Sequence, residues 1–310
     1  RFSPLVQAPR AVQLPLQASA QLSITFELLS SHACIQALGL DHVRLFIDGE
    51  PSFCAVLRDV LALNVVKAYL ESGDSGQWQA LPASPMKSVG FAEHEALIDW
   101  PARAHPAYRL LTEFFAFPEK FGFFDCDLNG AQGRRFTLHL LLGDVLPGST
   151  ASRLLEGLSA ANIRLHCTPV VNLFRQRARP ILVSHQAVSY NVVGDQQAAS
   201  AFEVHAIESV TRATETAGGN SVSEIRPFYS LHHGECLERN ALYWVAHRDE
   251  DLARKSPGHE LQLTIVDPDM DPISPGSSSL SLELTCSNRN LPERSEEHTS
   301  ELQSRQCISY

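Results

Sequence analysis

The two halves of the chain differ in how apolar and polar residues follow one another. In the first half, residues 22–28 alternate in the manner of a half-buried strand, and residues 42–48 predict a second strand that ends in an Asp-Gly turn. Residues 51–69 predict a helix with one apolar face, since a proline suits its first turn. Residues 135–142 predict an apolar strand and residues 152–158 a short helix.

The second half of the chain is almost entirely strand-like. Strands are expected at residues 181–193, 202–210, 241–247, 259–266 and 279–286. Polar loops, among them residues 214–223, separate these strands, and the spacing is typical of an antiparallel sandwich or barrel. We therefore predict an α+β fold with three parts. These are an α/β region over residues 1–160, a β-rich region over residues 161–292 and a tail over residues 293–310.

Both ends of the chain depart from this pattern. The sequence begins with Arg1, and its opening residues are neither a signal peptide nor a capped helix, so we expect coding sequence upstream. From about Glu293 the strand-like pattern stops abruptly, and the residues resemble the translated sequencing adapter that contaminates many assembled sequences. We therefore expect no selected structure or function in this tail, with an ordinary polar tail as the alternative.

Seven aromatic side chains fall within residues 104–125. Pro106 and Pro118 predict a helix over residues 106–117, because proline is tolerated in the first turn of a helix but not in its interior. Apolar residues occupy two neighbouring stripes of this helix, so we expect most of it to be buried. The alternative, a box for an aromatic ligand or cofactor, lacks a charged or phosphate-binding group at useful spacing.

Composition narrows the class of protein. Apolar residues make up 44% and charged residues 19% of the chain, and no run approaches the roughly 18 apolar residues of a membrane span. The net charge of −10 argues against a nucleic-acid partner, because an acidic protein repels phosphate groups. The seven cysteines form no closely spaced pair, which favours reduced thiols over a disulfide framework.

Two acidic clusters suggest calcium, and both lack essential ligands. Residues 125–130 match the first half of a calcium loop, but Phe136 stands where a bidentate Glu is needed, so a tight Asn-Gly turn is expected instead. Three aspartates within residues 267–271 have neither the glycine nor the distal Glu of such a loop and predict a solvated loop. We therefore predict no metal site and no cofactor.

An enzyme is the alternative from a different class. His232, His233 and Glu235 form the one compact group that could bind zinc or act as a base, with a carboxylate such as Asp267 completing a metal-dependent hydrolase. Adjacent residues on an extended chain point to opposite faces, which argues against this set. A β-rich binding module for carbohydrate or peptide is a third interpretation that rests on the carboxy-terminal strands only.

Several sequence blocks occur in a fixed order and are specific. The aromatic segment 104–125 is followed by CTPVVNLF at residues 167–174, and then by Tyr190 and Asp195. Residues 202–210, Pro227-Phe228-Tyr229, Tyr243-Trp244 and the block LTCSNRNLP at 284–292 complete the series. This series resembles the TssF family, also called ImpG or VasA, of the bacterial type VI secretion system. The residues that carry the resemblance are Tyr108, Phe114, Phe115, Pro118, Phe121, Cys167, Pro169, Asn172, Phe174, Tyr190, Asp195, Tyr243, Trp244, Asn288, Arg289 and Pro292.

The resemblance implies a structural role without catalysis. TssF-like proteins form a baseplate wedge with TssG, two copies to one, and the wedge joins TssK and the sheath-initiating TssE around a central hub. The implied location is the bacterial cytoplasm, docked near the inner membrane but not inserted into it. The resemblance covers the middle of a family protein about twice as long, and exposed members of the blocks 167–174 and 284–292 are expected at interfaces.

Overall fold

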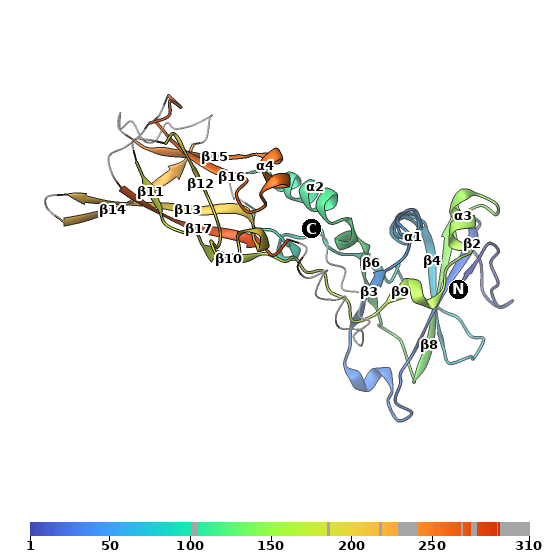
Figure 1. Ribbon diagram of the computed structural model, residues 1–310. Coiled ribbons are helices and arrows are strands. Elements are labelled where there is room, and N and C mark those ends of the chain that lie inside the picture. The colour runs from blue at the N-terminus through green and yellow to red at the C-terminus, as the bar shows by residue number, and fades with distance from the viewer. Residues whose placement is uncertain are drawn as a thin grey trace. The chain divides into compact units, whose positions relative to one another are not determined.

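The structure is a computed structural model that describes residues 1–100, 104–184, 187–216, 219–228, 241–267, 269–273, 278–289 and 291. The chain divides into two compact units, Arg1–Val170 and a second unit that begins at Val171. Figure 1 labels most of the helices and strands of the two units. The predicted α+β class is confirmed, since helices pack on sheets in the first unit and the second unit is dominated by strands.

Two antiparallel sheets make up the first unit. The larger one has the order β1-β2-β8-β4-β5, with bounds β1 Phe2–Ser3, β2 Ala18–Glu27, β8 Arg135–Gly143, β4 Val65–Ser72 and β5 Gln79–Ala80. The smaller one has the order β6-β7-β3-β9, with bounds β6 Met86–Ser88, β7 Phe123–Asp127, β3 His42–Ile47 and β9 Ile163–Arg164. The strands predicted at 22–28, 42–48 and 135–142 are confirmed.

Alternation along β2 and β8 builds the core of the first unit. Leu22 and Leu138 belong to the face that packs against α1 Pro51–Leu63 and α3 Thr150–Leu155, where Leu57 is fully buried. Side chains of the opposite face are mostly polar. Short 3₁₀ helices connect these elements: η1 Ile35–Leu38, η2 Glu93–Glu95, η3 Pro118–Gly122 and η4 Ala160–Asn162.

The helix predicted over residues 51–69 is wrong in its last part. Helix α1 ends at Leu63, and the chain enters β4 at Val65. Asn64 closes the helix, with its N–H donating to the carbonyl of Val60 at 3.0 Å. The β-branched pair that follows favours a strand, and pairing with β8 overrides the helical spacing of the apolar residues.

One sheet of eight strands forms most of the second unit. Its order is β10-β17-β13-β14-β15-β16-β12, with β11 also on β17, and the β14–β15 pair is parallel. The bounds are β10 Phe174–Arg177, β11 Ile181–Val183, β12 Ser189–Asn191, β13 Glu203–Thr216, β14 Gly219–Pro227, β15 Tyr243–Arg248, β16 Leu261–Val266 and β17 Ser278–Ser287. Helices η5 Ala199–Ala201 and α4 Glu250–Lys255 lie in its connections. Val210, Leu263 and Leu282 share one core, so the sheet must curl to bring β13 and β17 near β16.

The polar loop predicted over residues 214–223 is wrong. Strand β13 runs to Thr216 and β14 begins at Gly219, and the two pair antiparallel with Arg212 opposite Ser223 and Thr214 opposite Ser221. Its residues are polar, but threonine and valine favour an extended backbone as strongly as many apolar residues do. The polarity of these residues therefore did not predict their backbone conformation.

Candidate functional site

Helix α2, Pro106–Ala116, is set by local chemistry. The Nδ1 atom of His105 accepts the N–H of Ala107 at 3.2 Å before the first turn. The N–H of Phe117 donates to the carbonyl of Glu113 at 2.7 Å after the last turn, and Pro118 then opens η3. The helix predicted over residues 106–117 is confirmed to within one residue.

The apolar face of α2 is exposed. Tyr108 is 62%, Leu111 53% and Phe115 81% exposed, while Phe114 is 39% exposed. The expectation that most of this helix is buried is therefore wrong. The aromatic stripe faces away from the core of its unit, because a different set of side chains occupies the inner face.

Charged residues occupy that inner face. Glu113 is 3%, Arg109 5% and Lys120, from η3, 1% exposed. The Glu113 carboxylate accepts Nη1–H of Arg109 at 2.9 Å and also binds the Lys120 ammonium. Its second oxygen accepts the N–H of Leu97 at 2.8 Å. A carboxylate with partners on both oxygens can be buried without an unpaired charge.

The same ions attach α2 to the preceding loop. The second guanidinium nitrogen of Arg109 donates to the carbonyls of Phe91 and Ala92 at 3.2 and 3.3 Å. Because the partners of this cluster come from the loop before α2, from α2 itself and from η3, the cluster fixes the helix in one orientation. We call Arg109, Glu113 and Lys120 the inner ion cluster.

An apolar groove lies beside the exposed face. It has a volume of about 360 Å³ and is lined by Arg58, Phe91, Leu110, Leu111, Phe114 and Phe121. The Phe121 ring lies 5.1 Å from that of Phe91 and 5.8 Å from that of Phe114, between ring centroids. The Arg58 guanidinium lies 5.9 Å above the Phe114 ring. Exposed aromatic side chains beside an apolar groove are typical of surfaces that bind proteins.

Cys167 and Pro169 lie in the first unit, away from α2 in sequence. The Cys167 side chain is half-buried and packs against the cluster of Phe46, Val89 and Phe123. Pro169 lines a second, smaller cavity together with Arg44 and Lys120. Lys120 of the inner ion cluster therefore lines the same cavity as Pro169. Sequence spacing gave no signal for this juxtaposition.

Four of the predicted residues in the second unit, Phe174, Tyr190, Asp195 and Tyr243, have structural partners there. The Phe174 ring packs against Phe202 at 5.9 Å, and the Tyr190 hydroxyl donates to the carbonyl of Ser184 at 2.9 Å. Asp195 accepts the N–H of Gln197 at 2.8 Å. Tyr243 is buried and lies 5.9 Å from the Phe228 ring.

Arg289 belongs to a second ion cluster. Its guanidinium binds Glu260, which is 3% exposed, and donates to the carbonyl of Phe202 at 3.1 Å. Arg248 binds Glu203 and lies 3.8 Å from Glu260. Burial opposes ionisation of Glu260, but its hydrogen bonds and Arg289 together hold its pKa below the ordinary value. Asn288 precedes Arg289 and accepts the N–H of Leu291 at 3.1 Å.

Two of the residues that carry the family resemblance, Asn172 and Trp244, each bury a side-chain nitrogen. The Nδ2 atom of Asn172 and the Nε1 atom of Trp244 have no hydrogen-bond partner within the part of the chain that the structure describes. Such groups are rare in folded proteins. Pro292 lies outside the described residues.

The acidic clusters bind protein groups. Asp125 accepts two hydrogen bonds from the Arg44 guanidinium, at 2.8 and 2.9 Å, and chiefly these lower its pKa. Asp127 accepts the N–H of Asn129 at 2.8 Å in a turn where Gly130 has φ +88°. Asp267 accepts two backbone N–H groups of its own loop. Over the described residues, no group of three or more His, Cys, Asp or Glu side chains could hold a metal ion.

The residues of the hydrolase alternative, His232, His233 and Glu235, lie outside the described residues. Within the described residues, no helix is both long and apolar enough to cross a membrane. In the first unit, helix α2 has buried charged residues on one face and exposed aromatic side chains on the other. An exposed apolar helix face of this kind is typical of surfaces that bind another protein.

Comparison with known proteins gives the family. The family model described as "Type VI secretion system, TssF" matches residues 1–308, and the chain belongs to this family. The resemblance inferred from the sequence blocks is thereby confirmed. A curated relative, the type VI secretion system component TssF1 of Pseudomonas aeruginosa, is 29% identical over 267 residues, which are 83% of this chain and 42% of the relative. The chain thus spans less than half the length of that relative.

A solved structure shares the fold. A chain in the cryo-electron microscopy structure of the type VI secretion system TssK-TssF-TssG baseplate subcomplex matches with a TM-score of 0.57 and 21% identity. The match covers 89% of this chain and 48% of the other chain.

Proposed function

We propose that this chain is part of a structural subunit of the type VI secretion baseplate, which binds a TssG-type and a TssK-type partner. Membership of the TssF family and the shared fold with a chain of a TssK-TssF-TssG subcomplex support this proposal. The subunit works without catalysis. In more detail, we propose a wedge that contains two TssF copies and contacts TssE and the hub. We place this wedge in the cytoplasm, docked near the inner membrane.

The observation that carries the proposal is the exposed apolar face of α2. Tyr108, Leu111 and Phe115 are more than half exposed on one helix, next to an apolar groove. Removal of apolar surface from water contributes about 25 cal/mol per Å² before the entropy costs of association, so burial of this face would favour binding of a partner. The inner ion cluster holds the face in place before any partner arrives, which lowers the entropy lost on binding.

We assign the α2 face to the TssG-type partner. A permanent wedge needs a large apolar interface, whereas transient contacts are more polar. The signature residues Tyr108, Phe114 and Phe115 lie on this face, and Phe121 lines the adjoining groove. We propose that the exposed parts of residues 167–174 and 284–292 make further contacts in the assembly.

The test is co-purification from cells that co-express a full-length family protein and its TssG-type partner. Phe115→Ser in the full-length protein should reduce recovery of the partner at least tenfold, because it removes the most exposed aromatic side chain of the face. The matched control is Leu63→Ser, since Leu63 on α1 is also 81% exposed. Undiminished recovery with Phe115→Ser, or equal losses with both variants, would refute the assignment of this face.

A further inference from the structure

Strand β2 has a free edge. Strand β1 covers only its middle, with Phe2 opposite Leu22 and Ser3 opposite Gln21. Beyond that pair, Arg1 and Ser23 exchange both backbone hydrogen bonds, at 2.7 and 2.8 Å. In an antiparallel pair the next backbone groups on the same edge belong to every second residue, here Thr25 and Glu27. No described residue bonds the backbone of either on this edge.

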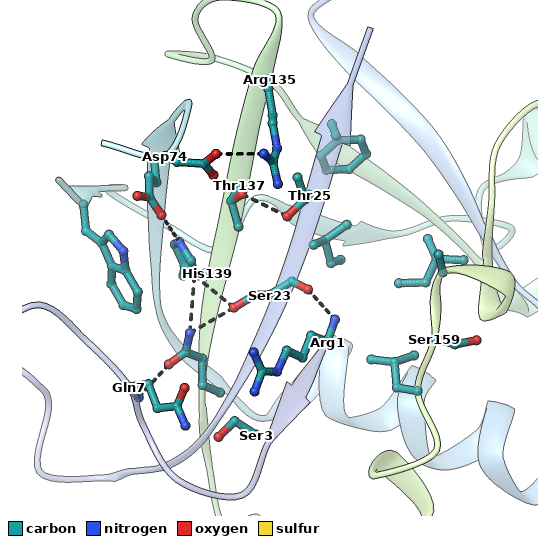
Figure 2. A pocket seen from close by; sticks show the side chains of 18 of the residues that line it. Arg1, Ser3, Gln7, Ser23, Thr25, Asp74, Arg135, Thr137, His139 and Ser159 are labelled. Carbon is teal, nitrogen blue, oxygen red and sulfur yellow. Dashed lines mark hydrogen bonds and ion pairs between the residues drawn. The ribbon is translucent and has the colours of Figure 1, made fainter. Parts of the chain in front are cut away.

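A pocket of about 800 Å³ lies along this free edge, and Figure 2 shows it from close by. On one side of β2 its lining is apolar and includes Ile24, Phe26, Leu45 and Ile163. On the other side the lining is polar and includes Ser23, Thr25, Thr137, His139 and Arg135. The pocket thus lies on both sides of the strand edge, and its two walls differ in polarity because successive residues of β2 point to opposite faces.

Hydrogen bonds hold the polar wall in one arrangement. The Thr25 and Thr137 hydroxyls lie 2.9 Å apart, and Arg135 donates to Asp74 at 2.8 Å (Figure 2). His139 bonds Ser23 through Nδ1 and Glu71 through Nε2, each at 2.9 Å. The side chains are therefore ordered before a ligand arrives.

We propose that the edge of β2 from Ser23 to Glu27 binds an extended polypeptide strand in antiparallel alignment. The strand would exchange backbone hydrogen bonds with Thr25 and Glu27. Cross-strand neighbours lie on the same face of a sheet, so its residues opposite Ile24 and Phe26 are apolar and those opposite Thr25 and Glu27 are polar. The occupant is a segment of the family protein outside the part that this chain covers.

Two observations favour this occupant over a small molecule or a second copy of the chain. The unpaired groups are backbone N–H and C=O groups in strand geometry, which another strand satisfies with the correct spacing. The curated relative has more than half its length outside the matched region, so full-length family proteins carry further segments. The proposal does not rest on the partners assigned to α2, because it concerns a different surface of the first unit.

The experiment adds the strand by fusion, which supplies it at high effective concentration. A four-residue extension on the amino side of Arg1 carries Val opposite Ile24 and Phe26 and Thr opposite Thr25 and Glu27. The control extension exchanges Val and Thr and so has the same composition. We expect the first extension to raise Tm by about 2–4 °C over the control, the shift that corresponds to roughly one added interaction of moderate strength in a domain of this size.

Amide hydrogen exchange gives a second readout that does not depend on overall stability. In the matched extension the N–H groups of Thr25 and Glu27 should become protected, while in the control they should exchange as in the unextended chain. Thr25→Pro removes one of these donors, whose N–H lies on the edge away from β8, and it also removes the hydroxyl contact with Thr137. Compared with the unextended Thr25→Pro chain, the matched extension should then give no Tm gain. Equal Tm values for the two extensions together with unchanged exchange at both residues would overturn the proposal.

Discussion

Helices α1 and α2 have the same local design and opposite burial. Both begin with a proline and are capped by the side chain of the preceding residue, Glu50 or His105. In α1 the buried residues are Phe53, Leu57, Val60 and Leu61, whereas in α2 they are Arg109 and Glu113. An amphipathic pattern therefore shows that a helix has two faces, but not which face is turned to the core.

The two helices are stabilised by different interactions. Helix α1 gains from apolar burial in the core of the first unit, as a surface helix usually does. Helix α2 depends on ions whose partners come from Leu97, Phe91, Ala92 and Lys120. This leaves its apolar face exposed, so stability and the proposed binding rest on different side chains.

We expect the largest loss of stability when the carboxylate of the inner ion cluster is removed. Glu113→Ala should lower the free energy of unfolding by about 3–5 kcal/mol, because it leaves Arg109 and Lys120 buried without their counter-charge. The measurement is urea unfolding of the chain, and the control is Glu119→Ala at an exposed position of η3. A loss below 1 kcal/mol would show that α2 is not held by its ions.

Leucine substitutions compare the two helices directly. Leu57→Ala in α1 should destabilise by about 2–5 kcal/mol, since Leu57 is fully buried. Leu111→Ala in α2 should change stability by no more than about 0.5 kcal/mol, since Leu111 is 53% exposed. Urea unfolding of both variants measures the contrast. Similar losses would mean that the α2 face is part of the core in solution.

Local signals predicted the limits of α2 but not its orientation. Pro106 and Pro118 act on neighbouring backbone atoms, so the limits could be inferred from sequence. The orientation depends on Glu113 finding Lys120 and the N–H of Leu97, and no spacing rule connects these three. Likewise, the family blocks identified the family, but the pocket at β2 arises from strand pairing across more than 100 residues.

The two faces of the larger sheet also differ, since one is apolar and the other contains buried His139. We expect His139 to have the smallest effect on stability, and this effect depends on pH. Burial lowers the pKa of His139, and its bond to Glu71 offsets this only in part. The native state therefore resists protonation, whereas the unfolded chain binds a proton near the ordinary pKa of about 6.5. Stability is complete above that pH and declines as the pH falls through it.

A matched pair of variants isolates this contribution. His139→Gln should reduce the drop in Tm between pH 7.5 and pH 5.5, because the variant has no imidazole to protonate on unfolding. Exposed His94→Gln is the control and should leave the drop unchanged. The lowered pKa of Glu71 places its own loss of stability below the ordinary value of 4.5, outside this window. An identical drop in all three proteins would mean that His139 binds a proton as readily in the folded chain as in the unfolded chain. Burial on the polar face would then not lower the pKa of His139.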